Sequence, residues 1–232
     1  MSETKRDFLY LIWKDPKTRR NYIVGKLTRG SAYTFEYCEE YEEAKEAGWE
    51  YLKAFPEDAR YRSQNLFAAF ASRLPDPKRR GIEGILRNYG LSEFDGYELL
   101  RKSTGRLPID TYEFVEPIFP DDEVIDKNFY IVGIRHNASC RGQACGDLPA
   151  VALGDELKLR PEPENKFDAC AVSVHLSNGE MLGYIPRYYS KGVSERLADG
   201  VTYSCRIIEI NQEQGCESCL RVNLEMPKRR ER

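Results

Sequence analysis

The stretch that decides the fold is Arg160–Arg187, which reads RPEPENKFDACAVSVHLSNGEMLGYIPR. Its first part predicts a loop, because its two prolines fix φ and remove two backbone donors. After this loop, apolar side chains at period two predict a β-strand with one face made of Cys170, Val172, Val174 and Leu176. Asn178 and Gly179 predict a tight hairpin turn with left-handed residues, and a return strand over residues 180–185 stops at Pro186.

The hairpin places Phe167 and Asp168 just before its first strand, next to the end of the return strand, where Tyr184 and Arg187 lie. Side chains grouped in this way at one end of a hairpin can hold a small planar ligand. A plain antiparallel hairpin that binds nothing explains the fold equally well, so the pattern alone leaves both interpretations open.

The composition is that of a folded chain with a packed core. The 232 residues are 41% hydrophobic and 31% charged, a length that allows one large domain or two small ones. No apolar run has the length that spans a bilayer. The N-terminus has no apolar segment of a signal peptide, so we expect a cytoplasmic location.

The charge argues against a strongly basic nucleic-acid-binding protein. The formal net charge is −3, and residues 127–232 hold 15 Lys/Arg against 14 Asp/Glu. Any affinity for DNA must therefore come from a local patch.

The N-terminal half predicts a mixed α+β domain over residues 1–119. Strands are expected at residues 8–13, 21–27 and 33–38, and a helix at 39–53 that Gly48 weakens. Ser63 is expected to cap a helix at 64–74 with one apolar stripe. Two further helices, at 79–89 and 94–103, precede a strand and an exit loop. The acidic, proline-flanked segment 119–127 predicts a short linker.

The C-terminal half, residues 127–232, predicts a small OB-like β-barrel with one short helix. Six strands support this prediction: residues 129–135, 155–160, the two strands of the hairpin, 201–210 and 219–226. The short helix is expected at residues 190–198, with Gly200 beyond its end.

Three segments of this half together resemble the HIRAN domain family. They are FYIVGIRHN (129–137), LGDELKLRPEPENKFDACAVSV (153–174) and GEMLGYIPR (179–187). HIRAN domains of eukaryotic fork-remodelling translocases bind 3′ ends of single-stranded DNA. The resemblance therefore implies DNA binding, with a binding set of Arg135, His136, Phe167, Asp168, Tyr184 and Arg187.

The chemistry of this set fits the end of a nucleic-acid strand. An aromatic face stacks a base, a carboxylate can accept a hydrogen bond from the sugar hydroxyl, and cations meet phosphates. Where the family usually has an aromatic pair after the arginine, this chain has His136 and Asn137. The structural alternative is that Asp168 caps a turn, Phe167 fills the core and the arginines are solvated.

Residues 8–117 are similar to the N-terminal subdomain of HipA-type kinases. The residues that carry this resemblance are Val24–Leu27, Tyr33–Tyr37 and Leu74-Pro75. In that family the subdomain touches partner proteins and carries no catalytic group. The chain shows no Gly-rich phosphate loop and no catalytic Asp with a metal-binding Asn, so we do not expect an enzyme.

The loop cysteines form a second candidate site. Cys140-x4-Cys145 and Cys216-x2-Cys219 are two close pairs of the kind that a structural zinc site uses. Nothing in the sequence shows that the two loops meet, so reduced cysteines that never converge remain the alternative. Cys38, Cys170 and Cys205 lie in strand patterns and are expected in the core.

Two functions follow as hypotheses. In the first, the C-terminal half binds single-stranded DNA or a DNA 3′ end, and the N-terminal half recruits a protein such as a helicase or nuclease. In the second, the chain is a bacterial protein-interaction adaptor, similar to an antitoxin of a HipA-type kinase system. There the N-terminal half binds a kinase or repressor and the C-terminal half is structural.

Overall fold

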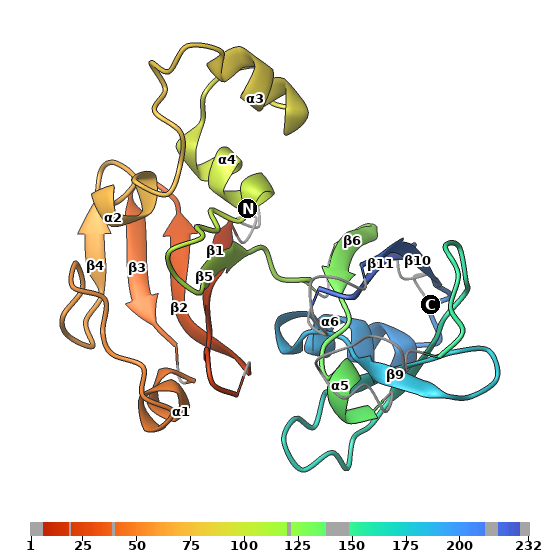
Figure 1. Cartoon of the computed structure of the whole chain (residues 1–232). Coiled ribbons are helices and arrows are strands. Elements are labelled where there is room, and N and C mark those ends of the chain that lie inside the picture. Colours follow the sequence, from red (N-terminus) through yellow and green to blue (C-terminus); the bar gives the residue numbers. More distant parts are fainter. Residues whose placement is uncertain are drawn as a thin grey trace. The chain divides into compact units, whose positions relative to one another are not determined.

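The structure is a computed structural model, and it describes residues 7–18, 20–38, 40–119, 122–137, 149–211 and 218–227. Its contacts divide the chain into two compact units, Met1–Pro117 and Ile118–Arg232, which are described separately below (Figure 1). No helix within the described ranges is both long enough and apolar enough to cross a membrane.

The first unit is built on an antiparallel sheet with the strand order β4-β3-β2-β1-β5. The three strands expected near its start are all present, as β1 (Phe8–Lys14), β2 (Asn21–Arg29) and β3 (Tyr33–Tyr37). The edge strands are β4 (Tyr61–Ser63) and β5 (Tyr112–Val115).

The helices of the first unit are shorter than the sequence predicts. They are α1 (Tyr41–Glu46), α2 (Ala68–Ala71), α3 (Ile82–Asn88) and α4 (Gly96–Ser103). The helix expected at 39–53 ends early because Gly48, at φ 97°, takes the left-handed conformation that terminates a helix. The helix α4 begins where Asp95 accepts hydrogen bonds from two backbone amides of its first turn.

The predicted helix at 64–74 is wrong in extent. Ser63 ends strand β4 instead of capping a helix, and only the single turn α2 is helical. The apolar residues Leu66, Phe67 and Phe70 still pack against the core of the unit. Their burial therefore does not require the long helix that their spacing favoured.

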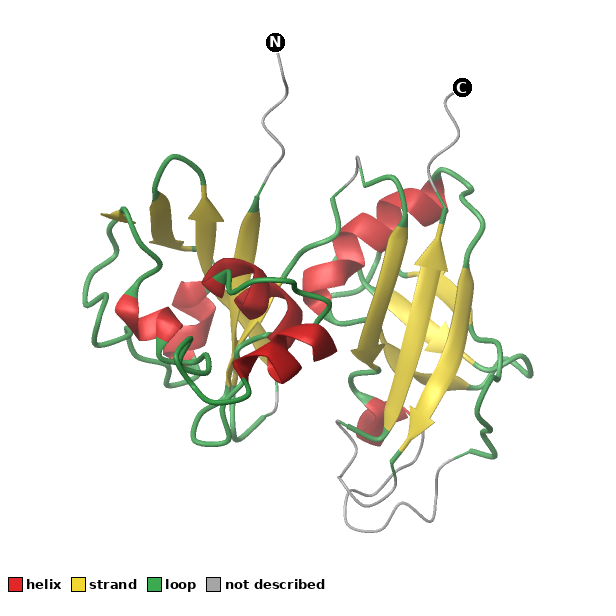
Figure 2. Cartoon of the chain, turned by 90° about the horizontal axis from the view of Figure 1, so that it is seen from above, coloured by secondary structure: helices red, strands yellow, loops and turns green. Residues whose placement is uncertain are grey.

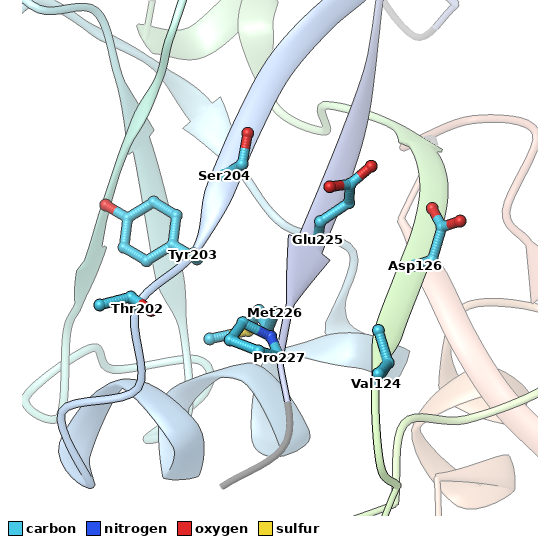
Figure 3. Close-up of a pocket in the computed structure, with 8 residues that line it drawn as sticks. All are labelled: Val124, Asp126, Thr202, Tyr203, Ser204, Glu225, Met226 and Pro227. Carbon is cyan, nitrogen blue, oxygen red and sulfur yellow. The ribbon is translucent and has the colours of Figure 1, made fainter. Parts of the chain in front are cut away.

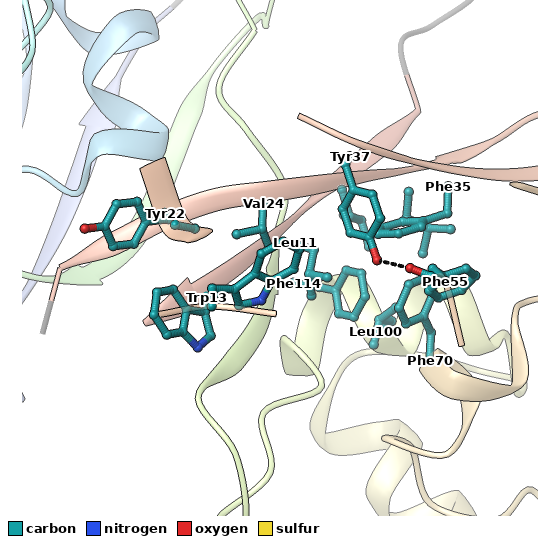
Figure 4. Packing of buried hydrophobic residues seen from close by; sticks show 14 of the residues in the cluster. Leu11, Trp13, Tyr22, Val24, Phe35, Tyr37, Phe55, Phe70, Leu100 and Phe114 are labelled. Carbon is teal, nitrogen blue, oxygen red and sulfur yellow. Dashed lines mark hydrogen bonds between the residues drawn. The ribbon is translucent and has the colours of Figure 1, made fainter. Parts of the chain in front are cut away.

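Aromatic rings dominate the core of the first unit, as Figure 4 shows. The ring of Phe35 lies 4.5 Å from that of Phe55, and Phe70 lies 4.9 Å from Phe114 between centroids, which are the separations of favourable aromatic pairs. The Tyr37 hydroxyl donates to the Phe55 carbonyl at 2.6 Å, so this buried polar group is satisfied.

The second unit contains two antiparallel three-stranded sheets, with the orders β10-β11-β6 and β7-β8-β9. Figure 2 shows its strands in two layers. The strands are β6 (Ile125–Tyr130), β7 (Lys158–Pro161), β8 (Val172–His175), β9 (Met181–Tyr184), β10 (Ser204–Ile210) and β11 (Leu220–Met226).

Isolated bridges join the two sheets of the second unit. Val132 pairs with Tyr184, and Glu156 pairs with Arg206. The number of strands matches the six expected, but neither sheet is closed on itself. The architecture is thus mixed α+β with antiparallel sheets, and the OB-like barrel stays a prediction.

The described part of the second unit has two helices where the sequence predicted one. Residues 134–135, expected at the end of a strand, belong to the short helix α5 (Ile134–Asn137). The helix expected at 190–198 begins three residues earlier, as α6 (Arg187–Ala198) directly after Pro186. Pro186 is the residue before the helix, and its ψ of 137° is not helical.

The hairpin at the centre of the sequence prediction is present, but its strand β8 is buried on both faces. Its polar residues Ser173 and His175 are only 1% and 8% exposed. They are satisfied because His175 Nε2 lies 2.9 Å from Ser173 Oγ and Nδ1 lies 3.2 Å from the Gly179 carbonyl. In the turn only Gly179, at φ 92°, is left-handed, whereas Asn178 accepts from the Glu180 amide at 2.9 Å.

The described residues of segment 119–127, expected as a linker, pack within the second unit. The guanidinium of Arg196 on α6 is 2% exposed and donates to the carbonyls of Phe119 and Asp122. It also donates to the Pro227 carbonyl at 3.3 Å. The strand β6 begins at Ile125, so the polypeptide is already part of the sheet at that point.

Candidate functional site

The candidate site is centred on the loop of residues 162–171, which connects β7 to β8. A backbone bond from the Glu162 amide to the Ala171 carbonyl, 2.8 Å, closes the base of the loop. Near the base, the Glu162 carboxylate accepts from the Tyr184 hydroxyl and from the Asn165 amide, both at 3.1 Å. These bonds fix the first half of the loop to strand β9.

The Glu162 carboxylate is held in its charged form. Burial raises the pKa of Glu162, but hydrogen bonds from Ser173, Asn165 and Tyr184 outweigh burial and lower the pKa overall. Burial, and then the hydrogen bond to Glu162, raise the pKa of the Tyr184 hydroxyl. At neutral pH the pair is therefore a carboxylate and a neutral phenol that donates to it.

The second half of the loop is fixed to helix α6. Asp168 Oδ1 accepts from the Cys170 amide at 2.8 Å, and Oδ2 accepts from the Ser190 hydroxyl at 2.7 Å. Ser190 is only 2% exposed, and its oxygen also lies 2.8 Å from the Arg187 carbonyl, its other acceptor. The structural alternative, in which Asp168 caps a turn, is confirmed by the bond from the Cys170 amide. The contact to Ser190 was not predicted.

Phe167 lies between these two fixed points with its ring in solvent. Its side chain is 80% exposed, while its backbone amide donates to Asn165 Oδ1 at 3.0 Å. The alternative interpretation that Phe167 fills the core is therefore wrong. A large apolar side chain gains nothing for folding from such a position, whereas an open aromatic face can stack on a base.

Backbone pairing brings α5, with Arg135 and His136, next to the end of β9. Val132 and Tyr184 exchange backbone hydrogen bonds of 3.0 and 2.9 Å. The close approach requires Gly183, because a Cβ there would lie 2.4 Å from the Val132 carbonyl. Both Arg135 and His136 are exposed, and Arg135 Nε lies 3.3 Å from His136 Nε2.

The remaining predicted residues lie where β9 leads into α6. Tyr184 ends the strand, and Arg187 is the first residue of the helix. The structure thus gathers Phe167, Asp168, Tyr184 and Arg187 on adjoining elements through the contacts of the loop. Arg135 and His136 are placed near them only through the backbone of β9.

Sequence reasoning missed Glu162, Asn165 and Ser190 as members of this site. The first two lie in the E-P-x-N part of the quoted segment, a signal that was visible in the sequence. Ser190 follows Asp168 by 22 residues within an ordinary helix, and nothing in its local sequence points to the contact.

Most of the predicted zinc ligands lie outside the described residues. Cys140, Cys145 and Cys216 belong to this group, and Cys219 is buried beside β11. Within the described ranges, no group of three or more His, Cys, Asp or Glu side chains could hold a metal ion. The zinc site stays a prediction, which metal analysis of the purified protein can check.

A pocket of about 330 Å³ lies at the end of the sheet β10-β11-β6, away from the loop residues described above (Figure 3). Asp126 and Glu225, which are cross-strand neighbours, both line it. Two adjacent carboxylates repel phosphate, so this pocket is a poor site for a nucleic acid.

The two units match two different family models. The model described as HipA N-terminal domain matches residues 19–108, and the model described as HIRAN domain matches residues 127–227. A search of the curated proteins returned no match.

Two solved structures are similar to part of the chain. The crystal structure of the HIRAN domain of human HLTF is 12% identical, with 45% of this chain and 76% of that chain covered at a TM-score of 0.36. A protein from Lactobacillus plantarum is 19% identical, with 45% of this chain and 96% of that chain covered, also at a TM-score of 0.36. From the matches to the family models it follows that the chain carries a HipA N-terminal domain followed by a HIRAN domain.

Proposed function

We propose that the HIRAN domain of this chain binds single-stranded DNA, with a terminal base stacked on Phe167 and a preference for a free 3′ end. The observation that carries the proposal is that Phe167 is 80% exposed, on a loop that Tyr184 holds at Glu162 and Ser190 holds at Asp168. Such a loop presents the ring without the entropic cost of ordering it on binding.

The charges around the loop support a contact with the DNA backbone. Arg135 and His136 are exposed on α5, and Arg187 begins α6 next to Ser190, which holds the loop. Since the second half of the chain is near neutral overall, the affinity is expected to be weak and local, with few phosphates neutralised.

The proposal is tested by titrating the full chain with labelled single strands that end in a 3′ hydroxyl or a 3′ phosphate. Phe167→Ala is expected to weaken binding by about 1–3 kcal/mol, the value of one stacked base. Leu153→Ala is the control, because Leu153 is 67% exposed in the same unit and away from the loop contacts. Equal binding by the wild type and Phe167→Ala would refute stacking, and equal affinity for both ends would refute end recognition.

Salt dependence gives a second readout of the same titration. Each phosphate contact to a single strand contributes about 0.7 to the slope of log affinity against log salt. Arg135→Ala should reduce that slope by this amount on every sequence alike, because a phosphate contact carries no sequence information.

The alternative is that the chain is an adaptor, and the HipA N-terminal domain favours it. In this case residues 19–108 bind a kinase core or a repressor, and the HIRAN domain is structural. Co-purification with a HipA-type kinase core, together with no measurable affinity for any single strand, would favour the adaptor. Under either function we expect no phosphoryl transfer, which incubation with labelled ATP can check.

A further inference from the structure

We propose that the first unit binds the phosphate backbone of duplex DNA through a basic surface on helix α3 and the turn before it. The surface, called the α3 basic surface below, is formed by Lys78, Arg79, Arg80 and Arg87. This inference goes beyond the proposed function, because these residues lie in the HipA N-terminal domain and not in the HIRAN domain.

The four cations are concentrated in one short segment. Residues 76–88 hold these four Lys/Arg against two Asp/Glu, whereas residues 1–117 as a whole hold 20 of each. The segment is thus a positive patch on a unit with no formal net charge. A chain without an overall basic excess needs such a local patch to bind DNA.

All four side chains of the α3 basic surface are exposed. Within the part of the chain that the structure describes, none of them forms an ion pair or a side-chain hydrogen bond. Other arginines of the unit are used by the fold, since Arg73 contacts Asp110 at 2.7 Å and Arg29 contacts Asp7 at 2.9 Å. The four cations repel one another without a carboxylate between them, and an anionic partner relieves that repulsion.

The turn that carries three of the cations is fixed by its backbone. Asp76 Oδ1 accepts from the Lys78 amide at 2.7 Å, and the Asp76 carbonyl accepts from the Arg79 amide at 2.9 Å. The next residue inward is Ile82, which is 8% exposed and packs in a small core with Leu99 of α4. A partner therefore meets a turn whose backbone is already ordered, which lowers the entropic cost of binding.

One face of α3 is open to a large partner. A Cβ on Gly84, in the middle of the helix, would meet nothing within 4 Å. Residues three apart share a helix face, so Arg87 lies on the same side as Gly84. Figure 1 shows α3 at one end of the first unit, with α4 next to it. The surface is thus accessible on the side of Gly84.

The chemistry of the surface favours a nucleic acid over an acidic protein. The seven residues of α3 span about 10 Å, and a duplex presents about six phosphate charges over that length. Three of the four cations are arginines, whose planar guanidinium binds phosphate oxygens in a bidentate manner. A protein partner is held by anchor side chains in a pocket, and the pocket described above lies in the second unit.

The test uses a duplex closed by a loop at both ends, because this DNA has no 3′ end to be recognised. The full chain is titrated with it across a range of salt concentrations. The triple variant Lys78→Gln, Arg79→Gln, Arg80→Gln should weaken binding by about threefold to a hundredfold, the value of three exposed ion pairs. It should also lower the slope of log affinity against log salt by about 0.9 for each lost phosphate contact, about 2.7 for three.

A second triple variant is the matched control. Lys17→Gln, Lys53→Gln, Arg62→Gln removes the same charge from exposed positions elsewhere in the first unit. It should leave the salt slope as in the wild type, because these positions are not part of the α3 basic surface. Equal effects of the two triple variants would show that only the net charge acts, and would overturn the inference.

Two other results would overturn it as well: no measurable binding of the closed duplex by the wild type, or binding by the α3 triple variant that equals the wild type. Thermal melting of each variant checks that it folds. If the triple variant does not fold, Arg87→Gln makes the same test with a slope change of about 0.9.

The outcome is distinguishable from that of the proposed function. Phe167→Ala should bind the closed duplex as the wild type does, since Phe167 lies in the other unit. Failure of Phe167→Ala to weaken binding of single strands with a free 3′ end refutes the proposed function alone. Failure of the α3 triple variant to weaken binding of the closed duplex refutes this inference alone.

Discussion

At the scale of single residues, Gly183 decides whether the two sheets of the HIRAN domain can meet at the candidate site. A Cβ at this position would lie 2.4 Å from the Val132 carbonyl and 2.9 Å from the Ile131 side chain. Both neighbours belong to the segment that leads into α5. The Val132 carbonyl is part of the backbone, so it cannot move aside as the end of a flexible side chain can.

We therefore expect Gly183→Ala to destabilise the HIRAN domain by about 1–3 kcal/mol, the usual cost of overpacking. Urea unfolding followed by far-UV circular dichroism measures this change. Both tryptophans of the chain, Trp13 and Trp49, lie in the first unit. The urea midpoint of unfolding followed by tryptophan fluorescence should therefore not change. Gly84→Ala, where a Cβ would meet nothing within 4 Å, is the control, and an equal effect of both substitutions would contradict this account.

The residues of the candidate site could be predicted from the sequence only in part. Phe167 and Asp168 could be found from the sequence because they lie in a segment with a family resemblance. The orientation of the Phe167 ring, toward the core or toward solvent, could not be found from the sequence, because a phenylalanine before a strand fits both orientations. The bond from Asp168 to Ser190 joins two elements, and no local pattern encodes such a contact.

At the scale of elements, the hairpin was predictable and the helices of the first unit were less so. Alternating apolar residues and Asn178-Gly179 determine the hairpin locally. The apolar stripe of residues 66–74 was misleading, because tertiary packing against Phe35 and Phe55 buries the same side chains around a single helical turn. Local propensity is a weak guide where packing decides.

The loop of residues 162–171 should lose stability in acid. The pKa of Glu162 is lowered in the folded protein from 4.5, so its contribution is fully present above pH 4.5. That contribution is lost as pH falls through the lower folded value. The difference in unfolding free energy between the wild type and Glu162→Gln should therefore be constant at higher pH and shrink in acid.

Denaturant titrations across this pH range measure that difference. Glu164→Gln, an exposed neighbour in the same loop, is the control and should change stability little at any pH. A difference for Glu162→Gln that grows as the pH falls would contradict the sign of the pKa shift.

At the scale of the whole molecule, the HIRAN domain begins earlier than its family match. The match starts at residue 127, but the division between the units falls between Pro117 and Ile118. A Cβ on Gly192 of α6 would lie 2.6 Å from Ile118, so this helix glycine makes room for the added segment.

A fragment of residues 118–232 should be markedly more stable than one of residues 127–232. The shorter fragment removes the Phe119 and Asp122 carbonyls that the buried Arg196 guanidinium contacts. Each hydrogen bond lost from a charged group costs about 1.5–3 kcal/mol. Thermal melting of the two fragments makes the comparison, and equal melting temperatures would show that the segment 118–126 adds nothing.

The same arginine has a consequence for how such a domain can be combined with others. Phe119 and Asp122 near its start and Pro227 near its end meet on one guanidinium, so the two ends of the fold are neighbours in space. Domains with adjacent ends tolerate circular permutation and insertion into a surface loop of a host protein. The domain is therefore suited to insertion into a loop of another protein. A circular permutant that joins residue 227 to residue 118 by a short linker should also fold.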